Sequence, residues 1–291
     1  MAVKKMMIAL APNLKKENAF GVTMDVCRQL DELGCDYTVV PEHASLFRDT
    51  RALPTDDEQF FSGSDIIISI GGDGTILHTA KRAAAYRKPV LGINAGRLGF
   101  MAGLEKHELQ LLSRLMDGKY TLDRRMMLSV TIEESDGKIQ NHFSCINDAV
   151  VSRGQQFQMI EFIVDINGKR ANRYLADGVI AATPTGSTAY SLSAGGPVMD
   201  PQINSIILTP ICTHSLFARS IVFSPDTEIS ISSAGERGNH LVLSCDGEDG
   251  CRIPPSCRVK IFRSDLYAEF IRIKSDTFID ILNTKLAQRR A

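Results

Sequence analysis

The chain of 291 residues contains no tryptophan, no C-x-x-C pair among its 7 cysteines and no long apolar run. A helix that crosses a membrane needs about 20 consecutive apolar residues, so we expect no membrane partner. Cysteines that are odd in number and lack metal-ligand spacing indicate neither a disulfide framework nor a zinc site. We therefore expect reduced thiols and a cytoplasmic location, whereas the missing tryptophan excludes no class of protein.

An excess of charge of either sign is also lacking. Lysine and arginine number 33 against 34 aspartate and glutamate residues, which gives a formal net charge of -1. A protein that binds nucleic acid through bulk electrostatics needs a basic excess that displaces the counterions of the phosphates. We therefore expect no nucleic-acid partner, although a local basic patch is not excluded. Hydrophobic content of 44% and charged content of 23% also exclude disordered and fibrous classes.

The first part of the chain alternates short apolar runs with helical patterns. The runs predict strands at residues 6–10, 37–40, 65–70 and 90–93, and apolar residues at helical spacing predict helices at 22–33, 77–84 and 105–116. This alternation is typical of a parallel sheet with right-handed crossovers. We predict a Rossmann-like α/β domain over residues 1–123.

The pattern changes after residue 123, where short runs rich in β-branched residues are separated by turn residues. Hairpin turns are indicated at residues 135–138 and at Asn167-Gly168. These runs, among them residues 139–152, 258–262 and 268–273, predict a multi-stranded, β-sandwich-like domain over residues 124–275. Helical spacing returns over residues 276–291, and we expect this terminal helix to pack back on the first domain.

The segment Gly71-Gly72-Asp73-Gly74-Thr75 lies directly between the strongest predicted strand and a helix. Glycines let the backbone approach a ligand, helix-start amides favour negative charge, and the threonine can cap the helix. Ligands of open α/β sheets bind at the carboxyl ends of the strands. We interpret the segment as a phosphate-handling loop with an acidic group, the alternative being a glycine turn capped by the aspartate.

Two further segments carry glycines and hydroxyls. Residues 91–99 repeat a glycine-bearing loop after the next strand, and residues 177–197 run from a strand into a hydroxyl-rich loop. Hydroxyls bind polar ligands, and Tyr190 offers an aromatic face for a base. The alternative for residues 91–99 is an ordinary strand-to-helix loop, and the alternative for residues 177–197 is a solvated linker.

Taken together, these segments resemble the NAD kinase family in its bacterial form. The resemblance rests on residues 71–75, 91–99, Asn147-Asp148, Asp177-Gly178 and 183–197, in the family's order. G-G-D-G-T is shared with diacylglycerol-type lipid kinases and phosphofructokinases. T-P-T-G-S-T-A-Y followed by S-A-G-G-P is highly specific.

The resemblance implies phosphoryl transfer from ATP to the 2′-hydroxyl of the adenosine ribose of NAD, which makes NADP. It also implies Mg²⁺ or another divalent cation, a homodimer or homotetramer, and dinucleotide binding by the β-rich domain. Three points stay open: polyphosphate as an alternative donor, NADH as an alternative acceptor, and the identity of an allosteric ligand.

By the same resemblance Asp73 is the catalytic residue, either accepting the proton of the attacking hydroxyl or helping to hold the metal. The implied phosphate loop consists of Gly71, Gly72, Gly74 and Thr75. The implied NAD-binding residues are Asp73, Gly74, His78, Asn147 for the adenine, Asp148 for the ribose, Asp177 for the nicotinamide end (reaching, on one interpretation, a neighbouring subunit), Thr188, Ala189, Tyr190 and Ser193.

The chain departs from the family at several positions. Many members carry glutamate where this chain has Asp148, serine where it has Ala176, and glutamine where it has Glu248. The roles of Glu248 and His78 therefore stay open. Two alternatives to an NAD kinase are a lipid kinase, which would need an apolar groove or a basic membrane face, and a non-catalytic NAD(P) sensor.

Overall fold

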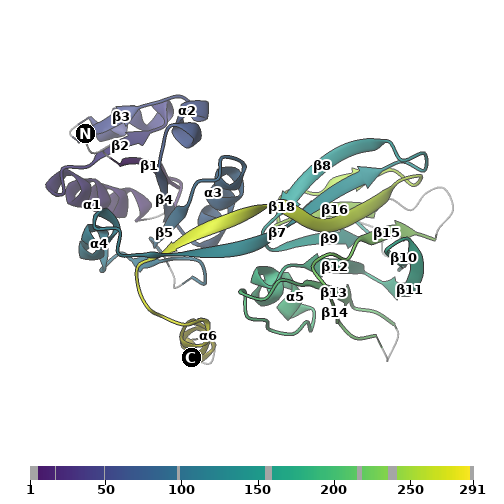
Figure 1. Ribbon diagram of the computed structural model, residues 1–291. Helices are drawn as coiled ribbons and strands as arrows, with labels where there is room; N and C mark the ends of the chain where they lie inside the picture. Colours follow the sequence, from purple (N-terminus) through teal and green to yellow (C-terminus); the bar gives the residue numbers. More distant parts are fainter. Residues whose placement is uncertain are drawn as a thin grey trace. The chain divides into compact units, whose positions relative to one another are not determined.

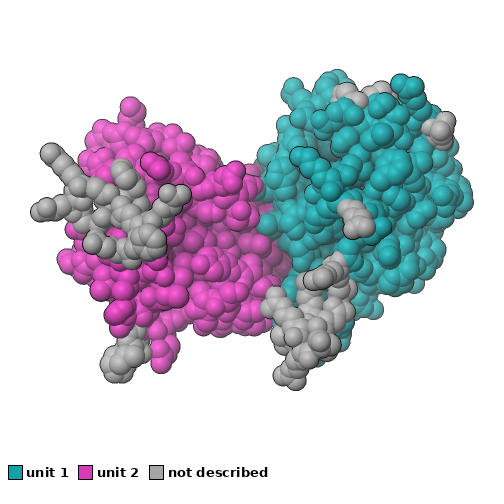
Figure 2. Space-filling view, turned by 180° about the vertical axis from the view of Figure 1, so that it is seen from behind, with its two compact units in different colours: residues 1–124, 268–291 teal, residues 125–267 magenta. Residues whose placement is uncertain are grey.

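The computed structural model describes residues 6–16, 18–48, 50–96, 99–154, 159–214, 218–234 and 241–288 (Figure 1). The chain divides into two compact units, coloured separately in Figure 2. Unit 1 comprises residues 1–124 and 268–291, and unit 2 comprises residues 125–267. None of the helices in the described residues is long and apolar enough to cross a membrane.

Unit 1 consists of short strands with helices between them, in an order that follows the predicted alternation. Its elements are β1 (Met7–Pro12), α1 (Ala19–Glu32), β2 (Asp36–Val39), the 3₁₀ helix η1 (Pro41–Phe47), β3 (Ala52–Pro54), α2 (Asp57–Ser62), β4 (Ile66–Gly71), α3 (Asp73–Ala85), β5 (Val90–Asn94), β6 (Leu104–Glu105), η2 (Leu109–Leu111), α4 (Leu112–Met116) and the C-terminal α6 (Phe278–Gln288). The strands β5, β4, β1, β2 and β3 are neighbours in that order and are all parallel. The predicted parallel α/β sheet is confirmed.

Helices cover both faces of this sheet. Ile66, Ile68 and Ile70 of β4 pack in one core with α1, η2 and α4. Ser69 points to the other face, where its hydroxyl donates to the Thr79 hydroxyl of α3 at 3.0 Å. Every residue of β4 is buried, which is the pattern of a parallel strand covered on both sides.

The helix predicted at residues 105–116 is wrong in its first half. Glu105 instead belongs to β6, where it pairs with Asn94 of β5. Its backbone N–H donates to the Glu108 carboxylate at 2.8 Å. Long-range strand pairing therefore overrides the local helical pattern, and helical structure begins only at η2.

Unit 2 is built from β-strands with two short helical segments. Its elements are β7 (Thr121–Glu133), β8 (Ile139–Cys145), β9 (Asp148–Ser152), β10 (Ile160–Ile166), β11 (Lys169–Ala176), β12 (Gly178–Ala182), the 3₁₀ helix η3 (Thr185–Thr188), α5 (Tyr190–Ser193), β13 (Ile206–Ile211), β14 (Ile221–Phe223), β15 (Ile229–Ser233), β16 (Leu241–Cys245), β17 (Cys251–Ile253) and most of β18 (Arg258–Arg272). One sheet has the order β14-β13-β12-β9-β16-β17, and the order β11-β10-β15-β18 belongs to the other.

Side chains from the two sheets of unit 2 meet in one core, which includes Phe162 of β10, Val179 of β12 and Leu243 of β16. The β-sandwich-like architecture is therefore confirmed. Both predicted hairpins also form, because β7 pairs antiparallel with β8 and β10 with β11. Asn167 and Gly168, with φ of 49° and 75°, make the second turn.

Three boundaries differ from the sequence-based expectation. The strand expected across residues 139–152 is broken between β8 and β9, and the two strands expected at 258–262 and 268–273 are the single strand β18. Residues 268–275 belong to unit 1 rather than to the β-rich unit. The reason is that Phe270 pairs with Val90 of β5, and Ile271 and Ile273 are buried in the core of unit 1.

Candidate active site

The loop between β4 and α3 is shaped by close backbone approaches. A Cβ atom on Gly71 would lie 2.5 Å from the Thr75 hydroxyl oxygen, and one on Gly72 would lie 2.9 Å from the Lys16 ammonium nitrogen. A side chain at position 71 would overlap Thr75, whereas one at position 72 would require only that the flexible Lys16 side chain move. The helix is capped at Gly72 rather than by Thr75, whose hydroxyl instead accepts from the Asn13 amide at 3.1 Å. The expected capping role of this threonine is therefore wrong.

Asp73 is the first residue of α3, and its carboxylate joins two loops. One oxygen accepts the backbone N–H of Phe100 at 2.8 Å, and the other accepts that of Met101 at 3.0 Å. A Cβ atom on Gly99 would collide with this carboxylate. The loop after β5 is thus built around Asp73, as expected for two loops at neighbouring carboxyl ends. Its residues 97 and 98 lie outside the described residues.

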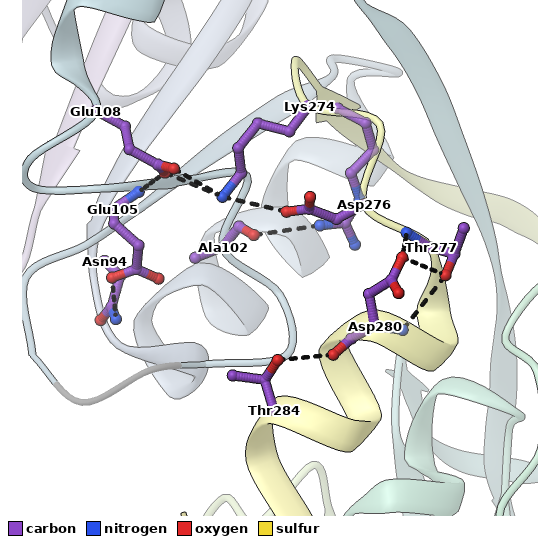
Figure 3. Close-up of polar contacts among 10 residues, drawn as sticks. Asn94, Ala102, Glu105, Glu108, Lys274, Asp276, Thr277, Asp280 and Thr284 are labelled. Carbon is purple, nitrogen blue, oxygen red and sulfur yellow. Dashed lines mark hydrogen bonds and ion pairs between the residues drawn. The ribbon is translucent and has the colours of Figure 1, made fainter. Parts of the chain in front are cut away.

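Asn94 ends β5 and organises the start of the same loop. Its side-chain amide donates to the Glu105 carboxylate at 2.8 Å, and its side-chain oxygen accepts the backbone N–H of Gly96 at 3.0 Å (Figure 3). Burial raises the pKa of Glu105, and the Asn94 hydrogen bond only partly opposes this. A half-buried carboxyl group therefore stands beside the loop that contacts Asp73.

A pocket of about 260 Å³ lies in unit 1, next to this loop. Its lining residues are Gly99, Ala102, Gly103, Glu105, Arg272, Lys274, Asp276, Asp280, Ile281 and Thr284. Three of them belong to α6, so the C-terminal helix does return to the first domain.

Both cationic groups of this pocket are engaged with neighbours. Arg272 donates to the Asp123 carboxylate at 3.1 Å and to the Ala102 carbonyl at 3.2 Å, and so holds the loop that also contacts Asp73. Lys274 pairs with the Glu108 carboxylate at 3.0 Å (Figure 3). Burial would lower the pKa of Lys274, but its ion pairs with Glu108 and Asp276 raise it. Sequence analysis missed Arg272 and Lys274, although basic residues two apart at a strand end share one face.

The two remaining predicted residues of this unit are exposed. A Cβ atom on Gly74 would meet no atom within 4 Å, so space rather than crowding surrounds it. His78 lies on α3, one turn after Asp73, with its side chain on the exposed side. Its expected contact with NAD stays a prediction.

In unit 2 the main chain at Asn147 is fixed from two directions. The backbone N–H of Asn147 donates to the Asp246 carboxylate at 2.7 Å. The carbonyl oxygen of Asn147 accepts the backbone N–H of Thr183 at 2.8 Å. The Thr183 hydroxyl also donates to the Ile146 carbonyl at 2.5 Å. These contacts explain why β8 and β9 are separate strands: the backbone turns here to meet the loop after β12.

Gly186 lies directly against this turn. A Cβ atom at this position would overlap the carbonyl group of Asn147, which is backbone and cannot rotate away. Gly186→Ala is therefore expected to displace the turn, to raise at least about tenfold the KM for the dinucleotide that the resemblance implies here, and to lower the free energy of unfolding by about 1–3 kcal/mol. Steady-state kinetics and urea unfolding would measure both effects.

The matched control is Gly21→Ala, where the added methyl group would meet nothing within 4 Å. Its position in α1 favours alanine. Unchanged KM and stability in the Gly186 variant would contradict the geometry described for this turn.

Asp148 is a buried carboxyl group, with only 4% of its surface exposed. Burial and the nearby charge of Asp246 raise its pKa to about 7, and a hydrogen bond from the backbone N–H of Tyr190 partly opposes the shift. A group that titrates near neutral pH in a polar site is a typical candidate for a functional residue.

The hydroxyl-rich loop uses many of its hydroxyls internally. Ser187 bonds the backbone of Met199, and Ser191 bonds the Thr209 hydroxyl at 3.1 Å. Tyr190 and Ser193 are exposed instead, the tyrosine by 47%. The loop is an ordered part of the unit, so the linker alternative is wrong, and only some of its hydroxyls face outward.

Asp177 is separated from the other predicted residues of this unit. It precedes β12, whereas Thr183 follows it, and six residue steps of about 3.3 Å each place the two residues about 20 Å apart. The Asp177 carboxylate accepts from the Arg153 guanidinium at 2.7 Å. Sequence analysis missed this arginine because the pairing of β9 with β12 brings it there.

The remaining predicted residues gather at the far end of β12. Asp148 pairs with Ala182, the last residue of that strand, and its side chain meets the first residue of α5. Thr188 and Ala189 are half-buried between η3 and α5. Asn147, Asp148 and the segment 188–193 therefore form one polar site, and Asp177 does not belong to it.

Family models match both parts of the chain. The model of the ATP-NAD kinase N-terminal domain matches residues 7–120, and that of the ATP-NAD kinase C-terminal domain matches residues 146–273.

Several NAD kinases are similar to this chain over nearly their whole length. The NAD kinase of Caldanaerobacter subterraneus subsp. tengcongensis is 38% identical over 284 residues, which is 97% of this chain and 99% of the relative. The NAD kinase of Symbiobacterium thermophilum is 39% identical over 281 residues, covering 96% and 98%.

Solved structures show the same fold. Yeast NADH kinase complexed with NADH gives a TM-score of 0.88 at 24% identity, covering 98% of this chain and 89% of that chain. An NAD kinase from Archaeoglobus fulgidus in complex with ATP gives 0.73 at 23% identity, covering 97% and 99%.

Proposed function

Because the chain belongs to the NAD kinase family and phosphorylates NAD to NADP with ATP as donor, we propose that Asp73 is the general base of this reaction. The observation that supports the proposal is the fixed carboxylate at the carboxyl ends of β4 and β5, held by the amides of Phe100 and Met101. In open α/β sheets this edge is where ligands bind.

The reaction joins the 2′-oxygen of the adenosine ribose to the γ-phosphorus of ATP. As that bond forms, the bond from the γ-phosphorus to the bridging oxygen breaks and ADP leaves. The hydroxyl proton passes to Asp73, which must be ionised to accept it. Two amide donors fix the direction of the carboxylate.

A divalent cation would enter this reaction with the substrate. No group of three or more histidine, cysteine, aspartate or glutamate residues suited to hold a metal occurs in the described part of the chain. The described residues therefore form no preformed cage for a cation. Mg²⁺ is commonly held by substrate phosphates with one or two carboxylates.

Asn147, Asp148 and the segment 188–193 are proposed to bind the dinucleotide. The Asn147 amide can donate to and accept from the adenine edge, and an ionised Asp148 can accept from the ribose hydroxyls. The exposed ring of Tyr190 provides a face on which a base can stack. We propose Thr188, Ala189 and Ser193 as the further contacts.

Asp177 is proposed to contact the nicotinamide end of NAD bound to a neighbouring subunit, within a homodimer or homotetramer. Its separation from Thr183 along β12 supports this, because a residue at the other end of the strand does not face the same site. Asp177→Ala is expected to raise the KM for NAD about tenfold and that for ATP less than twofold, which steady-state kinetics would measure. Equal effects on both constants would contradict the placement.

The proposed donor and acceptor are tested by one assay. Purified protein with NAD, ATP and Mg²⁺ is expected to form NADP, detected with a coupled dehydrogenase, and repeats with polyphosphate and with NADH would define the range of substrates. The lipid kinase and sensor alternatives find no support in the family matches. None of the seven cysteines, all of which lie in the described residues, forms a disulfide bond, and this supports the proposed cytoplasmic location.

A further inference from the structure

The turn that follows β16 reaches across to the break between β8 and β9. Asp246 and Gly247 form this turn in left-handed conformations, with φ of 54° and 75°. The left-handed region suits aspartate, asparagine and glycine better than other residues. The conformation points the Asp246 side chain at three successive backbone amides.

Those amides belong to Ile146, Asn147 and Asp148. One carboxylate oxygen of Asp246 accepts the N–H of Ile146 at 3.0 Å. The other accepts the N–H of Asn147 at 2.7 Å and that of Asp148 at 3.2 Å. Successive amides that converge on one anion form a nest, which fixes the backbone that carries them.

The contact is reciprocal, since the backbone N–H of Asp246 donates to the Asp148 carbonyl at 2.9 Å. The strands beside it add a regular ladder, in which Cys245 of β16 pairs with Ala149 of β9. Removing the carboxylate would leave amides of a partly buried turn without their acceptor, which is costly. The shape of the turn thus depends on the Asp246 side chain as well as on the contacts of Thr183.

We propose that Asp246 is a positioning residue for NAD binding, which acts by holding the Asn147-Asp148 turn and by placing a second carboxylate close to Asp148. The proposal rests on the dinucleotide-binding role given to these two residues above. Asp246 itself contacts backbone amides and is not a catalytic residue.

The electrostatic part of this role follows from the surroundings of Asp148. The groups that set its pKa among the described residues are the Asp246 carboxylate and the backbone N–H of Tyr190, together with burial. Because ribose hydroxyls donate to a carboxylate, the ionised form of Asp148 is the one that binds. NAD affinity is therefore expected to rise as pH increases through about 7.

The neighbouring Glu248 has a different place in this turn. Its side chain is exposed, and its carbonyl oxygen accepts the Ser244 hydroxyl at 2.7 Å. The exchange of glutamine for glutamate at this position therefore leaves the Asp246 contacts intact.

The test compares Asp246→Asn, Asp246→Glu and the wild type by the KM for NAD, the KM for ATP and kcat between pH 5.5 and 8.5. Asparagine keeps the left-handed turn but removes the charge, so we expect the KM for NAD to rise about tenfold and that for ATP to change less than twofold. The midpoint of the NAD profile should move to lower pH by about one unit, because a like charge near Asp148 is gone. Glutamate keeps the charge on a longer arm, so the KM should rise while the midpoint stays within a few tenths of a unit.

Asp136→Asn is the matched control, since this exposed aspartate also accepts one backbone amide, that of Lys138 at 2.9 Å in the β7–β8 turn. It should keep the wild-type KM and midpoint. An Asp246→Asn variant that is folded by circular dichroism and has an unchanged KM for NAD, or an unchanged midpoint, overturns the proposal. If that variant does not fold, a wild-type KM in Asp246→Glu overturns it. Asn147→Ala distinguishes failure of the proposed binding site from failure of the proposed role of Asp246. If Asn147→Ala leaves the KM for NAD unchanged, the binding role of the turn is wrong. If Asn147→Ala raises that KM and Asp246→Asn does not, only the positioning role of Asp246 is wrong.

Discussion

Asp73→Asn is expected to lower kcat for NAD phosphorylation by about 10²–10⁴-fold, the usual contribution of a general base. The asparagine side chain has the same shape, so one oxygen can still accept the amide of Phe100 or of Met101. Its NH₂ group cannot accept a proton or the second amide. Chemistry is therefore lost while the loop remains near its place, and NAD binding stays largely intact.

Stopped-flow or steady-state assays would give kcat, and calorimetry would give the affinity for NAD. Asp57→Asn is the control within the same unit, because Asp57 is an exposed acid whose partner is Arg82 at 3.5 Å. It should retain the wild-type kcat. A turnover within tenfold of the wild type in the Asp73 variant would remove this carboxylate from the chemistry.

Asp148→Asn is expected to change how stability depends on pH. The pKa of Asp148 is raised to about 7 in the folded protein, from an ordinary value of 3.8. The folded state therefore holds a proton that the unfolded chain releases, so Asp148 makes the free energy of unfolding fall as pH rises between these two values. Asparagine does not titrate, so the free energy of unfolding of the variant does not fall in this way as pH rises.

The difference in unfolding free energy, variant minus wild type, should grow by roughly 3 kcal/mol between pH 4.5 and 8. Urea unfolding at several pH values would measure it. Asn147→Ala changes the adjacent residue without adding or removing a titrating group, so its difference from the wild type should stay level across the same range. A flat difference for Asp148→Asn would show that this carboxyl group is ionised throughout.

Much of the fold follows from local patterns. The apolar run over residues 65–70 predicted β4, and the turn residues Asn167 and Gly168 predicted a hairpin that forms. The failures lie where distant pairing decides. Glu105 becomes a strand residue because it pairs with Asn94, and β18 continues through residues 263–267, between its pairing with β15 and its pairing with β5.

The candidate site was predictable in its residue types and not in its contacts. A glycine-flanked aspartate between a buried strand and a helix favours a phosphate-handling loop, with a plain glycine turn as the alternative. Asp73 binds the amide of Phe100, which lies 27 residues away in the sequence. Asp246 binds the amide of Asn147, which lies 99 residues away. Nothing in the local sequence selects such partners, because the sheet topology brings them together.

The strand β12 has a consequence for the motions that accompany turnover. It is hydrogen-bonded to β9 on one side and β13 on the other, and its five residues are all buried. Amides in such a strand exchange with solvent only when a large cooperative part of the unit unfolds, on a timescale far slower than catalysis. The spacing of Asp177 and Thr183 is therefore constant during a catalytic cycle. Motions that admit NAD and release NADP therefore take place outside this strand.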